Sequence, residues 1–406
     1  MEKVKIGIIR EGKNPPDKRV PFTPAQCRQL KDQFPELDIT VQPSSIRCFH
    51  DEEYEERGIR VDEDLSDCEY LFGVKEVPID MLLPNKTYFF FSHTFKKQPY
   101  NRDLLRAILE KNIRLVDYEV LTAKSGKRLV GFGRYAGVVG AYNALLAYGK
   151  KTNRYELKPA HECEDRKDME SELSKISLPK HFRIGLTGGG RVAGGAMEVL
   201  KTAGIEAVSP DEFTVEKFDD PIYAQLLVKD YVRRKDGADF VPRDFYRAPE
   251  EFDSNFMAFA GHMDVYIACH YWDNRSPFIF TRDDARDPVF NIRVVADVSC
   301  DIDGPVASTL RPSTIADPLY GYDPYLEREV DFEANNAIGV MAVDNLPCEL
   351  PKDASEDFGS ELMKNVLPAL LVEDPDDVIG RASQTNLKGE LTEEFSYLED
   401  YVLGRE

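Results

Sequence analysis

Ionisable side chains follow several apolar, strand-like runs in the first third of the chain. Each lies just past the carboxyl end of its run, and in a parallel sheet such residues converge on one crevice. Three lysines and two arginines would then face two glutamates and a histidine. Because arginine binds both oxygens of a carboxylate, this set predicts a pocket for a ligand with several carboxylates and an amine. The residues are Lys13, Arg19, Lys75, Glu76, His93, Lys96, Glu119 and Arg128.

Two of these residues are suited to moving protons. Lys75 is expected near other cations such as Lys96, which would lower the pKa of its ammonium group, although Glu76 would oppose that shift. A histidine titrates near neutrality without help, so His93 is the second candidate acid–base group. Taken alone, each residue is more often a solvated charge or, for His93, a packed residue at a strand end. The prediction therefore depends on their convergence.

The segment RIGLTGGGRVAGGAMEVLKTAGIEAVSPDEF at 183–213 carries the strongest local motif. An apolar strand runs into three glycines, and a helix with a small residue, Ala193, follows. Backbone N–H groups at the start of that helix can bind a pyrophosphate, which a Cβ on the loop would hold away. A second strand should then end in an acid that accepts the adenosine ribose hydroxyls. The candidate coenzyme contacts are Gly188, Gly190, Arg191, Val192 and Asp211.

The glycine loop alone is also compatible with a plain helix-opening turn. The strand, helix and second strand that flank it in order favour a dinucleotide. No arginine lies near Asp211 to bind a 2′-phosphate, which favours NAD as the coenzyme. If Ser209 instead occupies the ribose position, NADP would be accepted.

The elements that must position these residues alternate between strands and helices, which predicts parallel sheets covered on both faces. A helix should begin after Thr23 as N-cap, with Pro24 in its first turn. The charged stretch 151–180 and the stretch 214–257 read as insertions, the second of them helical, and the tail from 354 is helical by pattern. The expected strands are 4–9, 38–41, 70–74, 87–92, 114–118, 181–187, 263–268, 294–298 and 338–343, and the other expected helices are 101–111 and 136–150.

This order predicts an α/β protein of two Rossmann-like, doubly wound parallel-sheet domains with an active-site cleft between them. The substrate domain would be 1–138, completed by 346–406, and the dinucleotide-binding domain 139–345. The helix at 136–150 is rich in small residues and is expected to link the two. A chain of 406 residues exceeds the roughly 250–300 at which single cores stop growing.

Composition excludes several classes of function. A formal charge of -21 argues against nucleic acid and anionic membrane surfaces as partners. Seven scattered cysteines without zinc-like spacing indicate reduced thiols and no metal site. The absence of a signal-peptide pattern and of a long apolar run leads us to expect a cytoplasmic protein.

Several segments resemble the alanine dehydrogenase/transhydrogenase superfamily. Within it, they are most similar to the lysine-forming saccharopine dehydrogenases and to the lysine–ketoglutarate reductase domain of the aminoadipic semialdehyde synthase. The likeness is collinear over residues 19 to about 359. The segments are KRVPFTP, FGVKEVP, KTYFFFSHTFKKQ, RLVDYE, GKRLVGFGRYAGVVGA, VVADVSCDIDG and GVMAVDNLPCELPKDASEDFG.

The resemblance implies roles for particular residues. Arg19 matches the arginine that binds a substrate carboxylate, and Lys75 and His93 match the two acid–base groups. Lys13, Lys96, Glu119 and Arg128 fall on further positions of the substrate pocket, to which the strand-end argument adds Glu76. Asp297 matches an acid on the nicotinamide side, and Asp344 and Leu346 belong to a loop that meets the nicotinamide.

The implied activity is an NAD(P)-dependent saccharopine dehydrogenase that interconverts saccharopine with L-lysine and 2-oxoglutarate. Lys96 and Arg128 favour this ligand over alanine, because its three carboxylates require more cations. Two alternatives stay open. The first is an alanine dehydrogenase or a related amino-acid dehydrogenase, and the second is a non-catalytic, transhydrogenase-like nucleotide-binding subunit. The oligomeric state is not encoded in any pattern we recognise.

Overall fold

The computed structural model describes residues 3–405 and divides the chain into two compact units. Unit 1 comprises Met1–Phe132 and Pro351–Glu406, and unit 2 comprises Gly133–Leu350. The expected boundaries, after 138 and 345, therefore lie a few residues inside unit 2. The reason is local: residues 133–138 are the first turns of one continuous helix, α4 (Gly133–Thr152), and cannot be divided from it.

Unit 1 is built on a six-stranded sheet in which every neighbouring pair is parallel. The strand order is β3-β2-β1-β4-β5-β6, so the order reverses between β1 and β4. At such a reversal the loops after neighbouring strands diverge and leave room for a ligand. The strands are β1 (Val4–Ile8), β2 (Leu37–Val41), β3 (Arg60–Val61), β4 (Tyr70–Phe72), β5 (Thr87–Phe90) and β6 (Arg114–Asp117).

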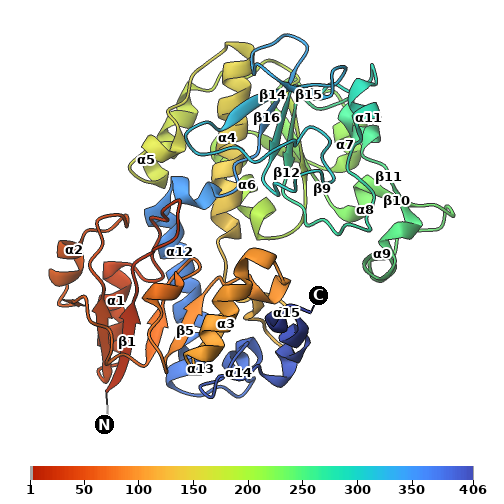
Figure 1. The fold of residues 1–406 in the computed structure, drawn as a ribbon. Coiled ribbons are helices and arrows are strands. Elements are labelled where there is room, and N and C mark those ends of the chain that lie inside the picture. The colour runs from red at the N-terminus through yellow and green to blue at the C-terminus, as the bar shows by residue number, and fades with distance from the viewer. Residues whose placement is uncertain (1–2, 406) are drawn as a thin grey trace. The chain divides into compact units, whose positions relative to one another are not determined.

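Helices from both ends of the chain cover the sheet of unit 1 (Figure 1). The first helix begins as expected, with Thr23 as its N-cap in a capping box and Pro24 at its first position. Phe358 and Leu362 of the returning segment pack in the same core as Ile8 and Phe89 of the sheet. The helices are α1 (Pro24–Gln33), α2 (Asp51–Glu55), α3 (Arg102–Glu110), α12 (Pro351–Asn365), α13 (Leu367–Leu371), α14 (Val378–Ala382) and α15 (Glu399–Leu403).

Unit 2 contains an eight-stranded sheet in the order β15-β14-β16-β13-β12-β7-β9-β8. Strands from β16 to β8 are parallel, while β14 runs antiparallel to both β15 and β16. The mixed α/β architecture and the doubly wound parallel sheets are those expected from the sequence. The strands are β7 (Arg183–Thr187), β8 (Glu206–Val208), β9 (Ile222–Leu226), β12 (Val265–Ala268), β13 (Val294–Asp297), β14 (Leu319–Asp323), β15 (Arg328–Val330) and β16 (Ile338–Met341).

The helical prediction for 214–257 is wrong. This segment contains β9, an interior strand of the sheet, and a two-stranded antiparallel hairpin of β10 (Val232–Arg234) and β11 (Phe252–Ser254). The hairpin and its neighbour α9 (Pro242–Arg247) project from the edge of unit 2 (Figure 1). The run IYAQL has only one polar residue and is too short to outweigh the charged residues around it, so the strand was missed.

The helix α4 packs closely against α6 (Arg191–Thr202), the helix that follows the glycine loop. Glycines permit this approach: an ideal Cβ on Gly137 would lie 1.8 Å from the Val192 carbonyl oxygen. A Cβ on Gly195 would lie 1.9 Å from the carbonyl oxygen of Arg134. The small residues of α4 thus serve packing within unit 2. The other helices of this unit are α5 (Arg166–Glu172), α7 (Pro210–Val215), α8 (Val228–Tyr231), α10 (Met257–Ala260) and α11 (Arg282–Arg286).

Candidate active site

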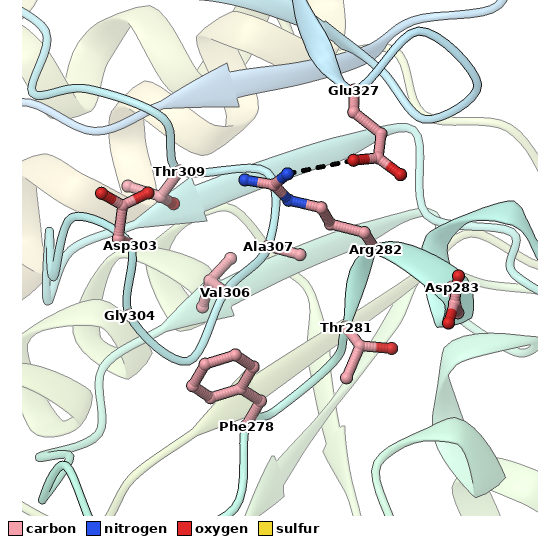
Figure 2. Close-up of a pocket in the computed structure, with 10 residues that line it drawn as sticks. All are labelled: Phe278, Thr281, Arg282, Asp283, Asp303, Gly304, Val306, Ala307, Thr309 and Glu327. Carbon is pink, nitrogen blue, oxygen red and sulfur yellow. Dashed lines mark hydrogen bonds and ion pairs between the residues drawn. The ribbon is translucent and has the colours of Figure 1, made fainter.

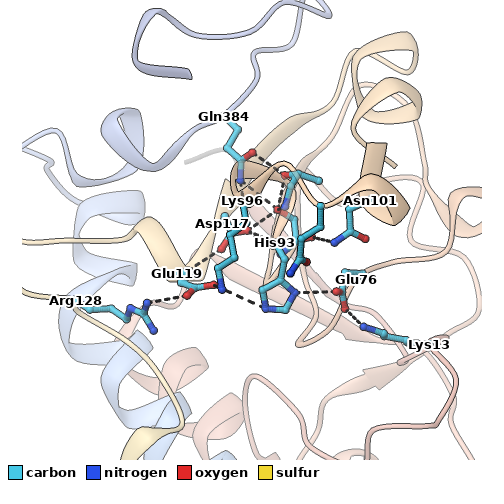
Figure 3. Close-up of polar contacts among 12 residues, drawn as sticks. Lys13, Glu76, His93, Lys96, Asn101, Asp117, Glu119, Arg128 and Gln384 are labelled. Atoms are coloured by element: carbon cyan, nitrogen blue, oxygen red, sulfur yellow. Dashed lines mark hydrogen bonds and ion pairs between the residues drawn. The ribbon is translucent and has the colours of Figure 1, made fainter. Parts of the chain in front are cut away.

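Glu76 joins two of the predicted site residues in unit 1 (Figure 3). Its carboxylate lies 2.7 Å from Lys13 Nζ and 2.8 Å from His93 Nδ1. The side chain is 8 % exposed, and burial would raise its pKa. The hydrogen bonds from His93 and Lys13 outweigh burial and lower the pKa of Glu76 to about 2. Glu76 is therefore an anion at every physiological pH, and it orients the His93 ring through Nδ1.

Glu119 pairs with two more of the cations predicted for the pocket, Lys96 and Arg128 (Figure 3). Lys96 Nζ lies 2.8 Å from one carboxylate oxygen, and Arg128 donates to the other at 2.9 Å. His93 Nε2 is 3.8 Å from the same carboxylate. Burial acts to raise the pKa of Glu119, but Lys96 and Arg128 lower it below the ordinary value. A single anion thus holds two cations in place.

Asp117 holds the backbone around His93 in place through hydrogen bonds. The carboxylate of Asp117 is fully buried and accepts the backbone N–H groups of Ser92, His93 and Glu119 at 2.8, 3.2 and 2.7 Å. His93 has a φ of +54°, in the left-handed region that is uncommon for a side chain of this kind. Gln384, from the returning C-terminal segment, donates to Ser92 Oγ at 3.2 Å. Such over-determined backbone conformations cluster at functional sites.

Lys75 lies beside two acids that the sequence interpretation did not name. Both carboxylate oxygens of Glu11 accept backbone N–H groups, from Val74 at 2.7 Å and from Lys75 at 2.8 Å. Burial and the nearby Asp17 raise the pKa of Glu11 to about 8. Glu11 lies three residues beyond the first strand, and that position was the available signal for it. The Lys75 ammonium itself has no hydrogen bond or ion pair with any residue between 3 and 405.

The pKa of Lys75 is lowered, chiefly by burial and then by the charge of Arg19. The sequence argument attributed this shift to Lys96, but Lys96 is paired with Glu119. A depressed ammonium pKa is the property required of a lysine that acts as a base. The direction of the expected shift is therefore present, with a different cause.

Arg19 is almost fully buried in a two-pronged ion pair with Asp17. Its Nε and one terminal nitrogen donate to the two Asp17 oxygens at 3.0 and 2.6 Å, and its guanidinium stacks 4.0 Å from the centre of the Phe132 ring. Arg19 holds the pKa of Asp17 well below its ordinary range, against the effect of burial. One edge of the guanidinium is thus occupied by Asp17.

The glycine loop in unit 2 has the geometry expected of a phosphate site. Gly188 has a φ of +111°, and a Cβ there would lie 2.4 Å from the Cys269 carbonyl oxygen. Gly190 is the N-cap of α6, and no atom lies within 4 Å of an added Cβ. A cavity of about 800 Å³ opens over this loop and includes Gly188, Gly190, Arg191 and Val192 in its lining. The residues and the space fit a dinucleotide.

Buried His270 also lines this cavity. Its Nδ1 lies 2.8 Å from the Thr187 hydroxyl, and burial lowers the pKa of the ring to about 4. Among the residues that the structure describes, the opposite nitrogen, Nε2, is buried without a hydrogen-bond partner.

The remaining predicted coenzyme contacts lie in unit 2 in different settings. Asp211 was expected where the second strand ends, but β8 ends at Val208 and Asp211 lies in the first turn of α7, exposed. Asp297 is fully buried and accepts the Thr309 hydroxyl at 2.7 Å, and burial raises its pKa to about 6. Asp344 is exposed just beyond β16, whereas Leu346 is buried.

A second cavity, of about 500 Å³, is lined in part by Thr309, whose hydroxyl donates to Asp297 (Figure 2). Arg282 also lines this cavity, but it is already paired with Glu327 at 3.0 Å. Between residues 3 and 405, no cluster of histidine, cysteine, aspartate and glutamate could hold a metal ion. Within the same range, no helix is both long and apolar enough to span a bilayer.

Comparisons with known proteins place these findings among relatives. Residues 7–139 match the model of the alanine dehydrogenase/PNT N-terminal domain. The chain is 29 % identical to alpha-aminoadipic semialdehyde synthase of Arabidopsis thaliana, over 97 % of this chain and 41 % of that protein. It is 26 % identical to a saccharopine dehydrogenase [NAD(+), L-lysine-forming] of Neurospora crassa, over 81 % and 82 % of the two chains. The chain spans less than half the length of the semialdehyde synthases that it matches.

A solved L-alanine dehydrogenase superposes with a TM-score of 0.62 at 14 % identity, covering 99 % of both chains. This likeness shows that the two proteins share a fold. The family model over residues 7–139 and the named relatives confirm the resemblance to the alanine dehydrogenase/PNT superfamily that the sequence motifs indicated.

Proposed function

We propose that this protein is a saccharopine dehydrogenase of the lysine-forming type, an oxidoreductase acting on CH–NH groups. The reaction joins L-lysine and 2-oxoglutarate reductively to saccharopine, and it is reversible. The observation that carries the proposal is the pair of cations held by Glu119, Lys96 at 2.8 Å and Arg128 at 2.9 Å. With Arg19 and Lys13 they give four cationic side chains for a ligand with three carboxylates, each cation held in position by an acid of unit 1.

The chemistry requires two proton-transfer groups. An amine of lysine attacks the ketone carbon of 2-oxoglutarate after losing a proton, and the carbinolamine then loses water with the help of an acid. Lys75, whose pKa is lowered by burial and by Arg19, is the group suited to accept the first proton. His93, oriented by Glu76, is suited to donate a proton to the leaving hydroxyl. The resulting imine is reduced to the secondary amine.

A nicotinamide dinucleotide would supply the hydride for that last step. In unit 2, the loop at Gly188 and Gly190 and the start of α6 at Arg191 and Val192 would hold its pyrophosphate. Asp297, Asp344 and Leu346 are assigned to the nicotinamide side by the family resemblance alone. If Asp211 lies at the adenosine ribose, the absence of an arginine near it in the sequence favours NAD over NADP.

The proposal is tested by following NADH and NADPH oxidation at 340 nm. One reaction contains L-lysine with 2-oxoglutarate, and a second contains pyruvate with ammonia. Turnover with lysine and 2-oxoglutarate alone supports the proposal. Turnover with pyruvate and ammonia would instead assign an alanine dehydrogenase, whose smaller acid leaves Lys96 and Arg128 without a carboxylate. Binding of NADH without turnover of either pair would favour a non-catalytic nucleotide-binding subunit.

The proton-transfer roles are tested with Lys75→Met and His93→Gln. General acid–base groups contribute roughly 10²–10⁴-fold to turnover, so each variant should lose kcat by that factor. Lys127→Met is the matched control, because Lys127 is an exposed lysine of the same unit. If both site variants kept the full rate, the two role assignments would be wrong even if the substrates were correct.

A further inference from the structure

The strand beside the glycine loop is β9. In unit 2, β7 pairs in parallel with β9 along its whole length, and β8 pairs only with β9 at the edge of the sheet. The loop is bonded to β9 directly: the Gly188 N–H donates to the Leu226 carbonyl at 3.0 Å, and Gln225 donates to the Gly188 carbonyl at 2.9 Å. In a dinucleotide fold, the adenosine ribose lies over the end of the strand next to the glycine-loop strand. In this chain, β9 ends at Leu226, and residues 227–231 follow it at that position.

This order separates Asp211 from the ribose position. Asp211 follows β8, which is two strand spacings, or roughly 9–10 Å, from β7. Asp211 is exposed in α7, and it does not line the cavity over the glycine loop. The usual acidic residue of the fingerprint therefore has no counterpart at this point of the chain.

The end of β9 presents a cation to the cavity. Leu227, Val228, Lys229 and Tyr231 line it, together with Arg191 at the start of α6. Lys229 is exposed and forms no hydrogen bond or ion pair with any residue between 3 and 405.

The acids near this wall do not replace the missing carboxylate. The adjacent Asp230 is not part of the lining, and its carboxylate accepts the Leu227 N–H at 2.8 Å. Asp273, which does line the cavity, is paired with Arg275 at 3.0 Å. Tyr246 and Trp272 add aromatic surface to the same cavity.

We infer that Lys229 determines coenzyme specificity in this protein, by binding a 2′-phosphate on the adenosine ribose at the end of β9. The inference rests on the proposed dinucleotide-dependent function, and it replaces the preference for NAD that followed from placing Asp211 at the ribose. The ligand class is a nicotinamide dinucleotide with a 2′-phosphate, NADPH in its reduced form. Lysine binds phosphate as a point charge, which suits an exposed position without a fixed partner.

The test measures the Kd values of NADPH and NADH by nicotinamide fluorescence for the full chain and its variants. A hydrogen bond to a charged group contributes about 1.5–3 kcal/mol, so Lys229→Gln should weaken NADPH binding by roughly 10–100-fold. NADH binding should change by less than about twofold, since NADH has no 2′-phosphate for this lysine to bind. Lys229→Arg, which keeps the charge, should retain tight NADPH binding. Arg233→Gln is the control for net charge, because Arg233 lies on β10, is exposed and does not line the cavity.

Competition with 2′,5′-ADP and 5′-ADP isolates the adenosine half from the rest of the reaction. Tighter binding of 2′,5′-ADP that is lost in Lys229→Gln supports the inference. The inference would be overturned if the wild type bound NADH more tightly than NADPH, if Lys229→Gln left both affinities unchanged, and if Asp211→Asn weakened NADH binding. That result would place the ribose beside Asp211 in α7. If neither coenzyme bound, the proposed function would fail as well, so the two failures are distinguishable.

Discussion

Two adjacent glycines in α6 should respond to alanine with opposite signs. At Gly194, no atom lies within 4 Å of an added Cβ, and the residue is in a helix interior. Alanine is favoured over glycine there by roughly 0.5–1 kcal/mol, so Gly194→Ala should raise the stability of unit 2. At Gly195, the added Cβ would lie 1.9 Å from the Arg134 carbonyl oxygen and 3.1 Å from the Val138 nitrogen of α4.

The displacement needed at Gly195 sets the expected magnitude. A carbon and a carbonyl oxygen touch at roughly 3.3 Å, so α4 and α6 would have to separate by about 1.4 Å. Overpacking of this kind costs typically 1–3 kcal/mol, and two backbone helices have no flexible side-chain end that could yield. We therefore expect Gly195→Ala to lose about 3 kcal/mol, near the upper end of that range. For a unit of this size, that corresponds to a Tm lower by about 6–12 °C.

The assay is thermal unfolding of the two variants and the wild type under one buffer condition, followed by circular dichroism. NADH and NADPH affinity is the second readout, since the start of α6 belongs to the proposed phosphate site. Gly195→Ala should weaken binding of both coenzymes, whereas Gly194→Ala should leave both affinities unchanged. Equal Tm values for the two variants would refute the reasoning from helix contact.

Three further predictions concern unit 1. Glu76→Gln removes the anion shared by Lys13 and His93, whose bonds to it are each worth about 1.5–3 kcal/mol, so kcat/KM should fall at least tenfold in the 340 nm assay. Asp117→Asn leaves three backbone donors with a weaker acceptor and should lower Tm and turnover together, whereas a loss of turnover alone would contradict a backbone-positioning role. Because the pKa of Glu11 is raised to about 8, folding binds a proton, and the stability it contributes below pH 4.5 should decline as pH rises to 8. Denaturant unfolding across pH 5–8 should show a smaller decline for Glu11→Gln than for the wild type.

The parts of the fold that could be predicted are those determined by short sequence patterns. The glycine loop, the capping box at Thr23 and most of the apolar strands follow from runs of a few residues, and the structure has them. The site cations were predictable because they stand at strand ends, where parallel topology gathers them. Their roles in substrate binding and catalysis remain proposals.

The parts that were missed depend on long-range order. No local pattern says that β9, reached after β8 in the chain, pairs with β7 and displaces β8 to the edge. The same difficulty applies to Glu11 and Asp17, which the sequence interpretation did not name. Their importance comes from burial beside Lys75 and Arg19, and burial is a property of the folded chain. The pKa of Lys75 was attributed to Lys96 wrongly for the same reason, because it is lowered chiefly by burial and then by Arg19.

The returning C-terminal segment also shields the edge of the sheet in unit 1. Strand β6 is the last strand of that sheet, and its Leu115 N–H and carbonyl are satisfied by Thr385 Oγ1 at 2.9 Å and by the Gln384 N–H at 2.8 Å. Uncovered strand edges are templates for pairing with other chains. On the ribosome, residues 1–132 emerge long before residues 383–385, so this edge stays bare while the whole of unit 2 is synthesised. The time for which this edge can pair with other chains is therefore set by how far residues 383–385 lie from β6 in the sequence.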